Sequence, residues 1–169
     1  GAAAAAPHLT WTEAPYEAGQ AVNMELGGCR HRYHGAMSRT LQLGAPPRKL
    51  VDLAALVVEG FHVALEAIRP GAECQAVEAA WRRVIARAGL EKPTRMGYSI
   101  GLNYPPDWGE RTASMRPGDT TLLAPGMTFH VIPAMWFDDW GFILSETVLV
   151  TETGSESLND FPRQLFVKD

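Results

Sequence analysis

Histidine is the residue type here best suited to acid–base or metal chemistry, because imidazole titrates near neutral pH and binds transition metals. The five histidines share no metal-binding spacing. His62 lies among the apolar residues of a helical pattern, which predicts a packing or partly exposed residue. His130 stands between apolar residues of a strand pattern, so it either finds a hydrogen-bond partner in the core or lines a cavity.

His31 and His34 flank Arg32 and Tyr33 in a segment with strand character. Successive side chains of a strand point to opposite faces, so the two histidines are predicted to lie on different faces. A metal pair is therefore not expected there.

Two short segments, 104–110 and 136–140, combine aromatic and acidic residues. Indole rings stack on cations and carboxylates offset their charge, so these segments have the composition of loops that close over a small polar ligand. The alternative without a binding function is that the two segments form rigid surface turns held by tryptophans. The candidate substrate-binding residues in these segments are Asp107, Trp108, Trp136, Asp139 and Trp140.

The elements that must position these residues can be read from periodicity. Residues 21–43 read as an antiparallel hairpin of two strands with a break at Gly27-Gly28. Apolar spacings of three and four predict one helix after Pro46-Pro47, ended by Pro70-Gly71, and a second over about 73–88 with an acid in its first turn. The remaining strands are predicted at 96–102, 121–123, 127–137 and 142–151. This order predicts an α+β domain in which a curved antiparallel sheet is backed by helices.

Composition excludes several function classes. The 169 residues are 46% hydrophobic, enough for one core, and carry a formal net charge of −4 without a basic stripe that could follow a phosphate backbone. No apolar run approaches the roughly 20 residues of a spanning helix. We therefore do not expect nucleic acid or a membrane as a partner. We expect the protein to be cytoplasmic. Cys29 and Cys74 are predicted to be buried, and the alanine-rich residues 1–7 to be flexible.

Several motifs in order carry a family resemblance. They are Glu25-Leu26-Gly27-Gly28, Ser38-Arg39-Thr40, Gly97-Tyr98-Ser99-Ile100-Gly101, Leu123-Ala124-Pro125-Gly126-Met127 and the segment 146–154. They resemble the catalytic domain of the pita-bread family, which includes prolidase, aminopeptidase P, methionine aminopeptidase and creatinase. The resemblance implies a partial pita-bread fold, with residues 1–169 as the C-terminal part of the catalytic domain and an N-terminal domain absent from this chain. It also implies a homodimer.

The peptidases of this family hold two metal ions with two aspartates, one histidine and two glutamates. The corresponding positions of this sequence are Glu25, Ala36, Tyr98, Ile132 and Ser145. Alanine and isoleucine cannot ligate a metal, and a hydroxyl is a poor substitute for carboxylate or imidazole. No metal and no cofactor are expected.

Creatinase hydrolyses C–N bonds without metal, and its proton-shuttling histidine corresponds to His8, seventeen residues before Glu25. Ser38 stands where creatinase is expected to carry a glutamate, so creatine is not favoured as the substrate. The sequence resembles the ectoine hydrolase members more than creatinase, since that resemblance accounts for Tyr98 and His130 together. The segments that carry it are 8–11, 33–34, 97–101, 105–110, 127–130, 138–141 and 162–168. Their substrate is a small cyclic amidine. This resemblance implies Glu25 as nucleophile or base, His8 and His130 as proton-transfer groups, and Glu146 as a partner of the cation or of a histidine. The substrate-binding residues implied are Tyr33, His34 and Tyr98.

Alternatives remain at this stage. Glu25 could merely pair with Arg39 in the same sheet, and Arg39 could be a structural clasp or a partner for a substrate carboxylate. The whole chain could instead be a peptidase-like or creatinase-like hydrolase of another small substrate, or a non-catalytic fragment.

Overall fold

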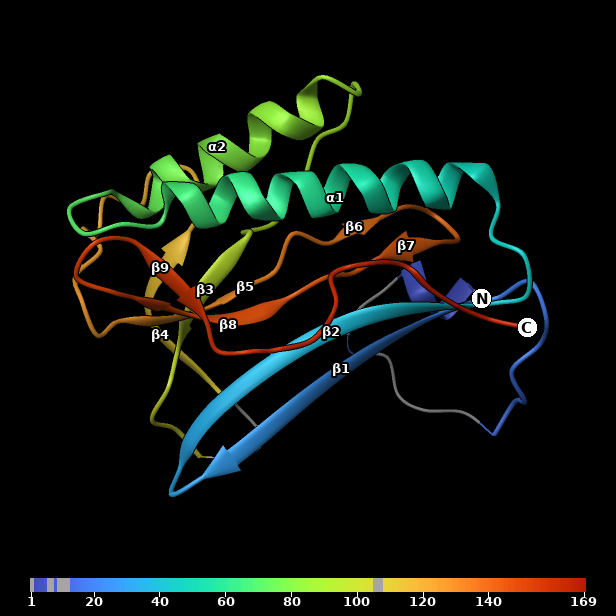
Figure 1. Cartoon of the computed structure of the whole chain (residues 1–169), viewed down its shortest axis with the longest axis horizontal. Helices are drawn as coiled ribbons and strands as arrows, with labels where there is room; N and C mark the ends of the chain where they lie inside the picture. The colour runs from blue at the N-terminus through green and yellow to red at the C-terminus, as the bar shows by residue number, and fades with distance from the viewer. Residues whose placement is uncertain (1, 6–7, 9–12, 105–107) are drawn as a thin grey trace.

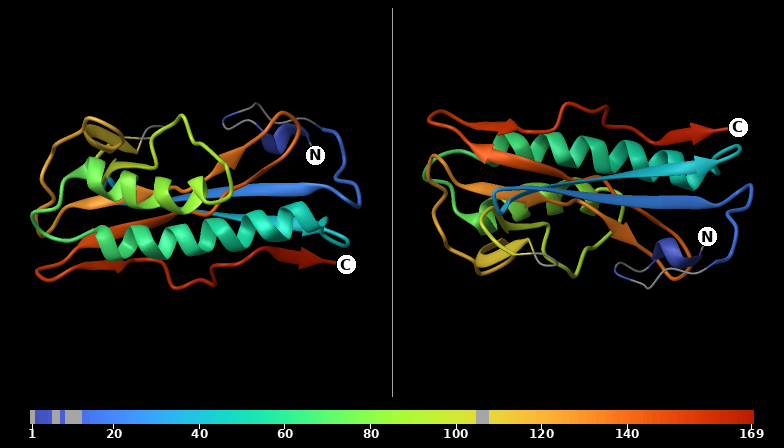
Figure 2. Two further views of the ribbon diagram at one scale, coloured as in Figure 1. Left: turned by 90° about the horizontal axis from the view of Figure 1, so that it is seen from above. Right: turned by 90° about the horizontal axis from the view of Figure 1, so that it is seen from below.

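Two helices lie side by side over one face of a curved, mainly antiparallel sheet (Figures 1 and 2). The computed structural model describes residues 2–5, 8, 13–104 and 108–169. The predicted α+β class is confirmed. Within the part described, no helix is long and apolar enough to cross a membrane.

Helix α1 spans Arg48–Ala67 and helix α2 spans Cys74–Ala86. The predicted helices are therefore confirmed, although Glu73 precedes the first turn of α2 and is its N-cap residue. The two helices approach closely because Gly60 of α1 has no side chain: a Cβ there would lie 2.3 Å from ring carbons of Trp81. Trp81 is fully buried at this contact.

The strands form three groups. A three-stranded sheet has the order β1-β2-β10, a five-stranded sheet has the order β4-β3-β5-β8-β9, and β6 pairs with β7. Neighbours are antiparallel except β10 and β2, which run parallel. The bounds are β1 Ala21–Arg30, β2 Tyr33–Leu43, β3 Gly97–Ile100, β4 Gly109–Met115, β5 Thr128–Val131, β6 Met135–Trp136, β7 Gly141–Phe142, β8 Glu146–Val150, β9 Ser155–Ser157 and β10 Phe166–Lys168.

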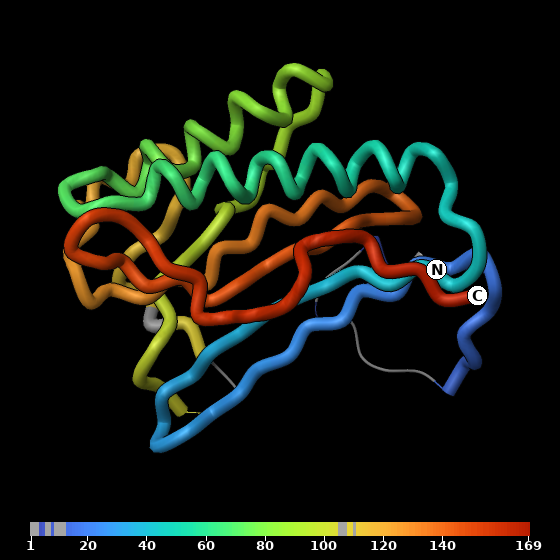
Figure 3. The backbone as a smooth tube through the Cα atoms, in the orientation of Figure 1, coloured from blue at the N-terminus to red at the C-terminus, as the bar shows by residue number. Residues whose placement is uncertain are grey.

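The predicted antiparallel hairpin over 21–43 is confirmed, and its tip projects away from the helices (Figure 3). The predicted break at Gly27-Gly28 is wrong, because β1 continues through both glycines to Arg30. The turn is made by His31 and Arg32, which have φ values of 51° and 68°. The predicted alternation of these histidines along one strand is therefore also wrong.

Among the residues described, two backbone bridges join β2 to residues next to strands of the five-stranded sheet, one between Tyr33 and Leu102 and one between Ser38 and Ser145. The amide of Ser38 donates to the carbonyl of Ser145, and the amide of Ser145 donates back to Ser38, both over 3.1 Å. This pairing connects β2 to the residue that precedes β8. It brings the hairpin and the five-stranded sheet into one continuous curved surface.

Residues 2–5 form a short 3₁₀ helix, and the carbonyl of Ala4 accepts a hydrogen bond from Asn23 Nδ2 over 2.9 Å. The flexibility expected of residues 1–7 stays a prediction. Of the two cysteines predicted to be buried, Cys74 is buried and Cys29 is exposed, because Cys29 lies near the tip of the projecting hairpin.

Candidate active site

A cavity of about 260 Å³ lies between the hairpin and the β3–β4 pair. This volume is near the lower end of the range for small-ligand pockets. Four residues singled out from the sequence, His8, Glu25, Tyr98 and Trp108, are brought together here. The described residues that line it are His8, Glu25, Arg95, Tyr98, Trp108, Gly109 and Arg111.

Trp108 and Tyr98 are held by each other and by the hairpin. The indole Nε1 of Trp108 donates a hydrogen bond to the hydroxyl of Tyr98 over 2.8 Å. A Cβ at Gly27 would come within 2.7 Å of the Trp108 ring, so only glycine lets β1 lie this close to the indole. Gly27, which was predicted to be part of a break, therefore allows the Trp108 ring to pack against β1 at the cavity.

The residues that follow β3 are tied to the hairpin tip. The backbone amide of Asn103 donates to the carbonyl of Arg32 over 3.0 Å, and Arg32 Nη1 donates to the hydroxyl of Tyr104 over 2.6 Å. The hairpin tip is thus joined to residues 103–104.

The charges in the cavity are of both signs. The Glu25 side chain is 26% exposed, and Arg95 and Arg111 belong to the same lining. The Arg95 guanidinium lies 4.2 Å from the centre of the Tyr98 ring. His8 and Arg111 both have left-handed backbone, with φ values of 60° and 61°. Such backbone is uncommon for residues other than glycine and clusters at functional sites.

His130 is fully buried behind this cavity. Its Nδ1 lies 2.8 Å from the Tyr98 hydroxyl, and its Nε2 lies 2.7 Å from the Ser145 hydroxyl. Burial, helped by the positive charge of Arg95, lowers the pKa of His130 to about 3. The imidazole is therefore neutral at physiological pH. Of the two possibilities for His130, the structure shows the residue with hydrogen-bond partners in the core.

Glu146 lies away from the cavity lining and is fully buried. Its carboxylate accepts hydrogen bonds from Arg39 Nη2 over 2.5 Å, from Arg163 Nη2 over 2.8 Å and from the Ser157 hydroxyl. Arg39 also donates to backbone carbonyls, including those of Ser38 and Ser145. Of its two possibilities, Arg39 thus has the structural one. The alternative in which Glu25 pairs with Arg39 does not hold, because Arg39 pairs with Glu146.

Tyr33 and His34 line a different cavity, of about 680 Å³, on the other face of the hairpin. Leu26 and Leu158 contribute apolar surface there, and Tyr33 is 63% exposed. The ring nitrogen Nε2 of His34 is buried and has no hydrogen-bond partner among the residues that the structure describes. Adjacent side chains of β1 point to opposite faces, which is why Glu25 and Leu26 line different cavities.

The second predicted loop does not reach either cavity lining among the residues described. Trp136 and Trp140 stack on cations of this chain: Lys92 Nζ lies 4.5 Å from the Trp136 ring centre, and Lys49 Nζ lies 4.4 Å from that of Trp140. Asp139 is exposed in the turn between β6 and β7. This loop matches the alternative of a rigid surface turn. Asp107 lies outside the described residues.

Sequence reasoning missed Arg95 and Arg111. Arg95 precedes Tyr98 by three residues, a proximity that could have marked it. Arg111 belongs to β4, where a ligand-closing loop was expected instead of a strand. Nothing in the pattern distinguished Arg111 from other exposed arginines.

The positions that hold metal in the peptidases do not supply a ligand set here. Ala36 and Ile132 carry no donor, and the hydroxyls of Tyr98 and Ser145 are both engaged with His130. Within residues 2–5, 8, 13–104 and 108–169, no group of three or more His, Cys, Asp and Glu side chains could hold a metal ion. These residues do not fit the two-metal site.

Comparisons with known proteins agree with this fold. The model of metallopeptidase family M24 matches residues 1–152. An ectoine hydrolase of Halomonas elongata is 48% identical over 98% of this chain and 42% of its own length, and a probable dipeptidase PepE of Mycobacterium tuberculosis is 32% identical over 95% and 43%. The crystal structure of dipeptidase PepE from Mycobacterium ulcerans has a TM-score of 0.89 at 30% identity, covering 97% of this chain and 44% of that one. The chain spans less than half the length of these relatives.

Proposed function

Because this chain belongs to metallopeptidase family M24, we propose that its cavity serves a hydrolase which opens a small cyclic amidine at a C–N bond, with ectoine as the substrate. The observation that carries the proposal is that one acidic residue, Glu25, and two basic residues, Arg95 and Arg111, line the same cavity. The similarity to an ectoine hydrolase supports it.

Ectoine carries both charges that such a lining would recognise. Its ring is an amidinium cation, and a carboxylate is attached to that ring. A carboxylate pairs with the amidinium, while guanidinium groups bind carboxylates with charge-assisted hydrogen bonds. In this proposal Glu25 binds the amidinium group, which is the part of the substrate that reacts. Arg95 and Arg111 bind the substrate carboxylate. Trp108 provides an aromatic face for the ring.

The reaction is hydrolysis without change of oxidation state. Glu25 takes a proton from water, whose oxygen forms a bond to the amidinium carbon. The C–N bond of the resulting tetrahedral carbon then breaks, and the departing nitrogen takes up the proton. In the variant with Glu25 as nucleophile, its oxygen bonds to the same carbon first, and the C–N bond breaks as the departing nitrogen takes a proton from His8. Water then attacks the acyl carbon, gives a proton back to His8 and breaks the bond to the Glu25 oxygen. His8, which also lines the cavity, is the second proton-transfer group.

We propose that this chemistry is independent of metal. The amidinium carbon is already electrophilic because the substrate carries the positive charge. The peptidases need a Lewis acid for a neutral amide, whereas here the donor set at the corresponding positions is incomplete. The homodimer and the separate N-terminal domain stay predictions. Sedimentation of the full-length protein measures whether it is a dimer.

Proton NMR of ectoine incubated with the full-length protein in excess chelator tests the proposal. We expect the N-acetyl signals of ring-opened diaminobutyrate to appear at the same rate with and without chelator. An unchanged ectoine spectrum would contradict the proposal that ectoine is the substrate. Turnover that stops with chelator and returns with Mn²⁺ would contradict metal independence alone.

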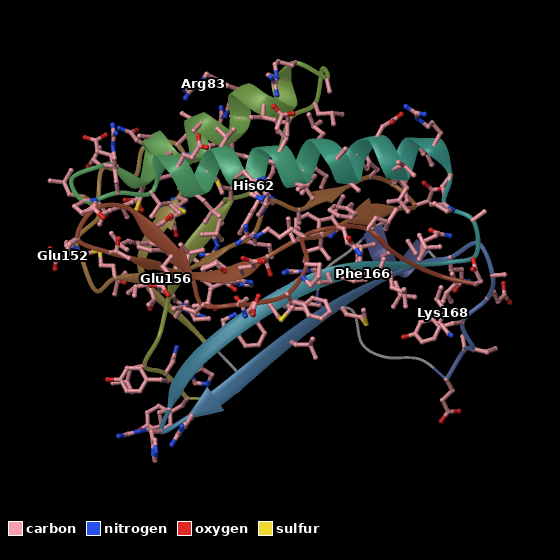
Figure 4. All side chains as sticks on the ribbon, in the orientation of Figure 1. His62, Arg83, Glu152, Glu156, Phe166 and Lys168 are labelled. Atoms are coloured by element: carbon pink, nitrogen blue, oxygen red, sulfur yellow. The ribbon has the colours of Figure 1, made fainter. Side chains whose placement is uncertain are left out.

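Replacing Arg95 by methionine is expected to raise KM for ectoine about tenfold or more, since a hydrogen bond to a charged group contributes about 1.5–3 kcal/mol. Steady-state kinetics of the full-length protein measure this. The control is Arg83→Met on the exposed side of α2 (Figure 4), for which no change is expected. Equal KM values in both variants would show that Arg95 does not bind substrate.

A further inference from the structure

A row of hydrogen-bonded polar side chains connects Glu25 to Tyr98 behind the cavity. We propose that Ser38 and Ser145 are positioning residues, which connect Glu25 to His130 and Tyr98 through one chain of hydrogen bonds that all point toward the Glu25 carboxylate. The catalytic consequence of this chain rests on the proposed function. Its existence and direction rest on the geometry alone.

The chain follows the lateral pairing of the strands. Glu25 of β1 stands opposite Ser38 of β2, and Ser38 stands opposite Ser145. His130 of β5 stands opposite Tyr98 of β3 and opposite Thr147 of β8. Ser145 is two residues before Thr147, so it is a diagonal neighbour of His130 on the same face. Side chains at opposing positions of neighbouring strands point to the same face of a sheet. The sheet itself therefore aligns these five residues.

The direction of the first two bonds follows from counting protons. An ionised carboxylate only accepts hydrogen bonds, so the hydroxyl of Ser38 donates to Glu25 Oε1, over 3.3 Å. A hydroxyl carries one proton, and that of Ser38 is now used. The hydroxyl of Ser145 must therefore donate to Ser38 Oγ, over 2.8 Å.

The same count fixes the tautomer of His130. Since the proton of Ser145 is used on Ser38, His130 Nε2 must be the donor to Ser145, over 2.7 Å. A neutral imidazole has one donor and one acceptor nitrogen, so Nδ1 accepts from the Tyr98 hydroxyl over 2.8 Å. Tyr98 in turn accepts from Trp108 Nε1 over 2.8 Å. All the donors thus point from Trp108 toward Glu25.

This chain holds the Glu25 carboxylate in one orientation and links it to two side chains of the same cavity, Tyr98 and Trp108. Ser38, Ser145 and His130 are at most 2% exposed and are absent from the lining, so they act through Glu25 and Tyr98. The fully buried His130 is thus a positioning residue. His8 stays the histidine that reaches the substrate.

Nitrogen NMR of the full-length protein without substrate tests the chain directly. Long-range imidazole correlations distinguish the two neutral tautomers from the cation, and the His130→Gln variant identifies the signals of His130. We expect a neutral ring protonated on Nε2 between pH 5 and pH 8. A ring protonated on Nδ1, or a cation at pH 6, would overturn the proposal.

Turnover of ectoine gives the second measurement. Ser145→Ala is expected to lower kcat about 10²-fold with little change in KM, because misplacement of a reacting group by about 1 Å has an effect of that order. The control is Ser99→Ala, which removes a buried hydroxyl of β3 that bonds to Thr112 over 2.8 Å. Parent-like kcat in folded Ser145→Ala protein would contradict the positioning role.

The two measurements separate this inference from the proposed function. A protein that shows the Nε2 tautomer but leaves ectoine intact would support the chain and contradict the substrate. A protein that opens ectoine with His130 protonated on Nδ1 would support the substrate and contradict the chain.

Discussion

Replacing Glu25 by glutamine is expected to lower ectoine turnover about 10³-fold, within the range that a positioned acid–base group contributes. The amide keeps the size of the side chain and accepts the bond from Ser38, but it neither pairs with an amidinium nor takes a proton from water. Proton NMR of ectoine with the full-length variant measures the loss. The circular dichroism spectrum and melting temperature should match those of the parent, because the Glu25 side chain is partly exposed.

The matched control for this prediction is Glu156→Gln. Glu156 is an exposed glutamate of β9 (Figure 4), so its charge is removed far from the proposed chemistry. Its turnover should equal that of the parent. Near-normal turnover in the Glu25 variant would remove Glu25 from the mechanism and leave His8 as the remaining candidate base in the cavity.

The second large effect concerns stability. Glu146→Ala is expected to lower the free energy of unfolding by about 3–5 kcal/mol, because removing one partner of a buried ion pair leaves the other charge uncompensated. Arg39 is 2% exposed, and burial already lowers its pKa against the opposing effect of Glu146. Without that carboxylate the guanidinium stays buried with backbone carbonyls as partners. Urea denaturation followed by circular dichroism measures the change.

Asp52→Asn provides the comparison for this variant. Asp52 forms an exposed ion pair with Arg48 one turn away on α1, and such pairs contribute about 0–1 kcal/mol. A loss below about 1 kcal/mol in Glu146→Ala would show that Arg39 and Arg163 find other partners. The clasp would then not be what holds the segment around Glu146 to β2.

The parts of the fold that depend on local pattern were predictable. Both helices follow from apolar spacings of three and four, and the hairpin follows from strand character on both sides of a turn. The strands β4, β9 and β10 were missed. They are short or, in β4, rich in residues of low strand preference, and their pairing with distant strands decides their conformation.

Of the candidate site, residue type and the family motifs indicated His8, Glu25, Tyr98 and Trp108. Glu146 has the same residue type as Glu25, yet it is enclosed by Arg39 and Arg163 while Glu25 faces a cavity. The sequence contains no signal for this difference, because it depends on contacts made after folding. Arg39, for example, is 107 positions from Glu146 in the sequence.

By itself the sequence determined the fold class, the family and the lack of a complete set of peptidase metal ligands, since each depends on residue identity and local order. The tertiary structure alone decided which carboxylate shares a cavity with Arg95 and Arg111, which histidine is buried and neutral, and how Ser38 and Ser145 link that histidine to Glu25. Hydrogen bonds and desolvation act over a few ångströms, and only folding brings these residues within that distance.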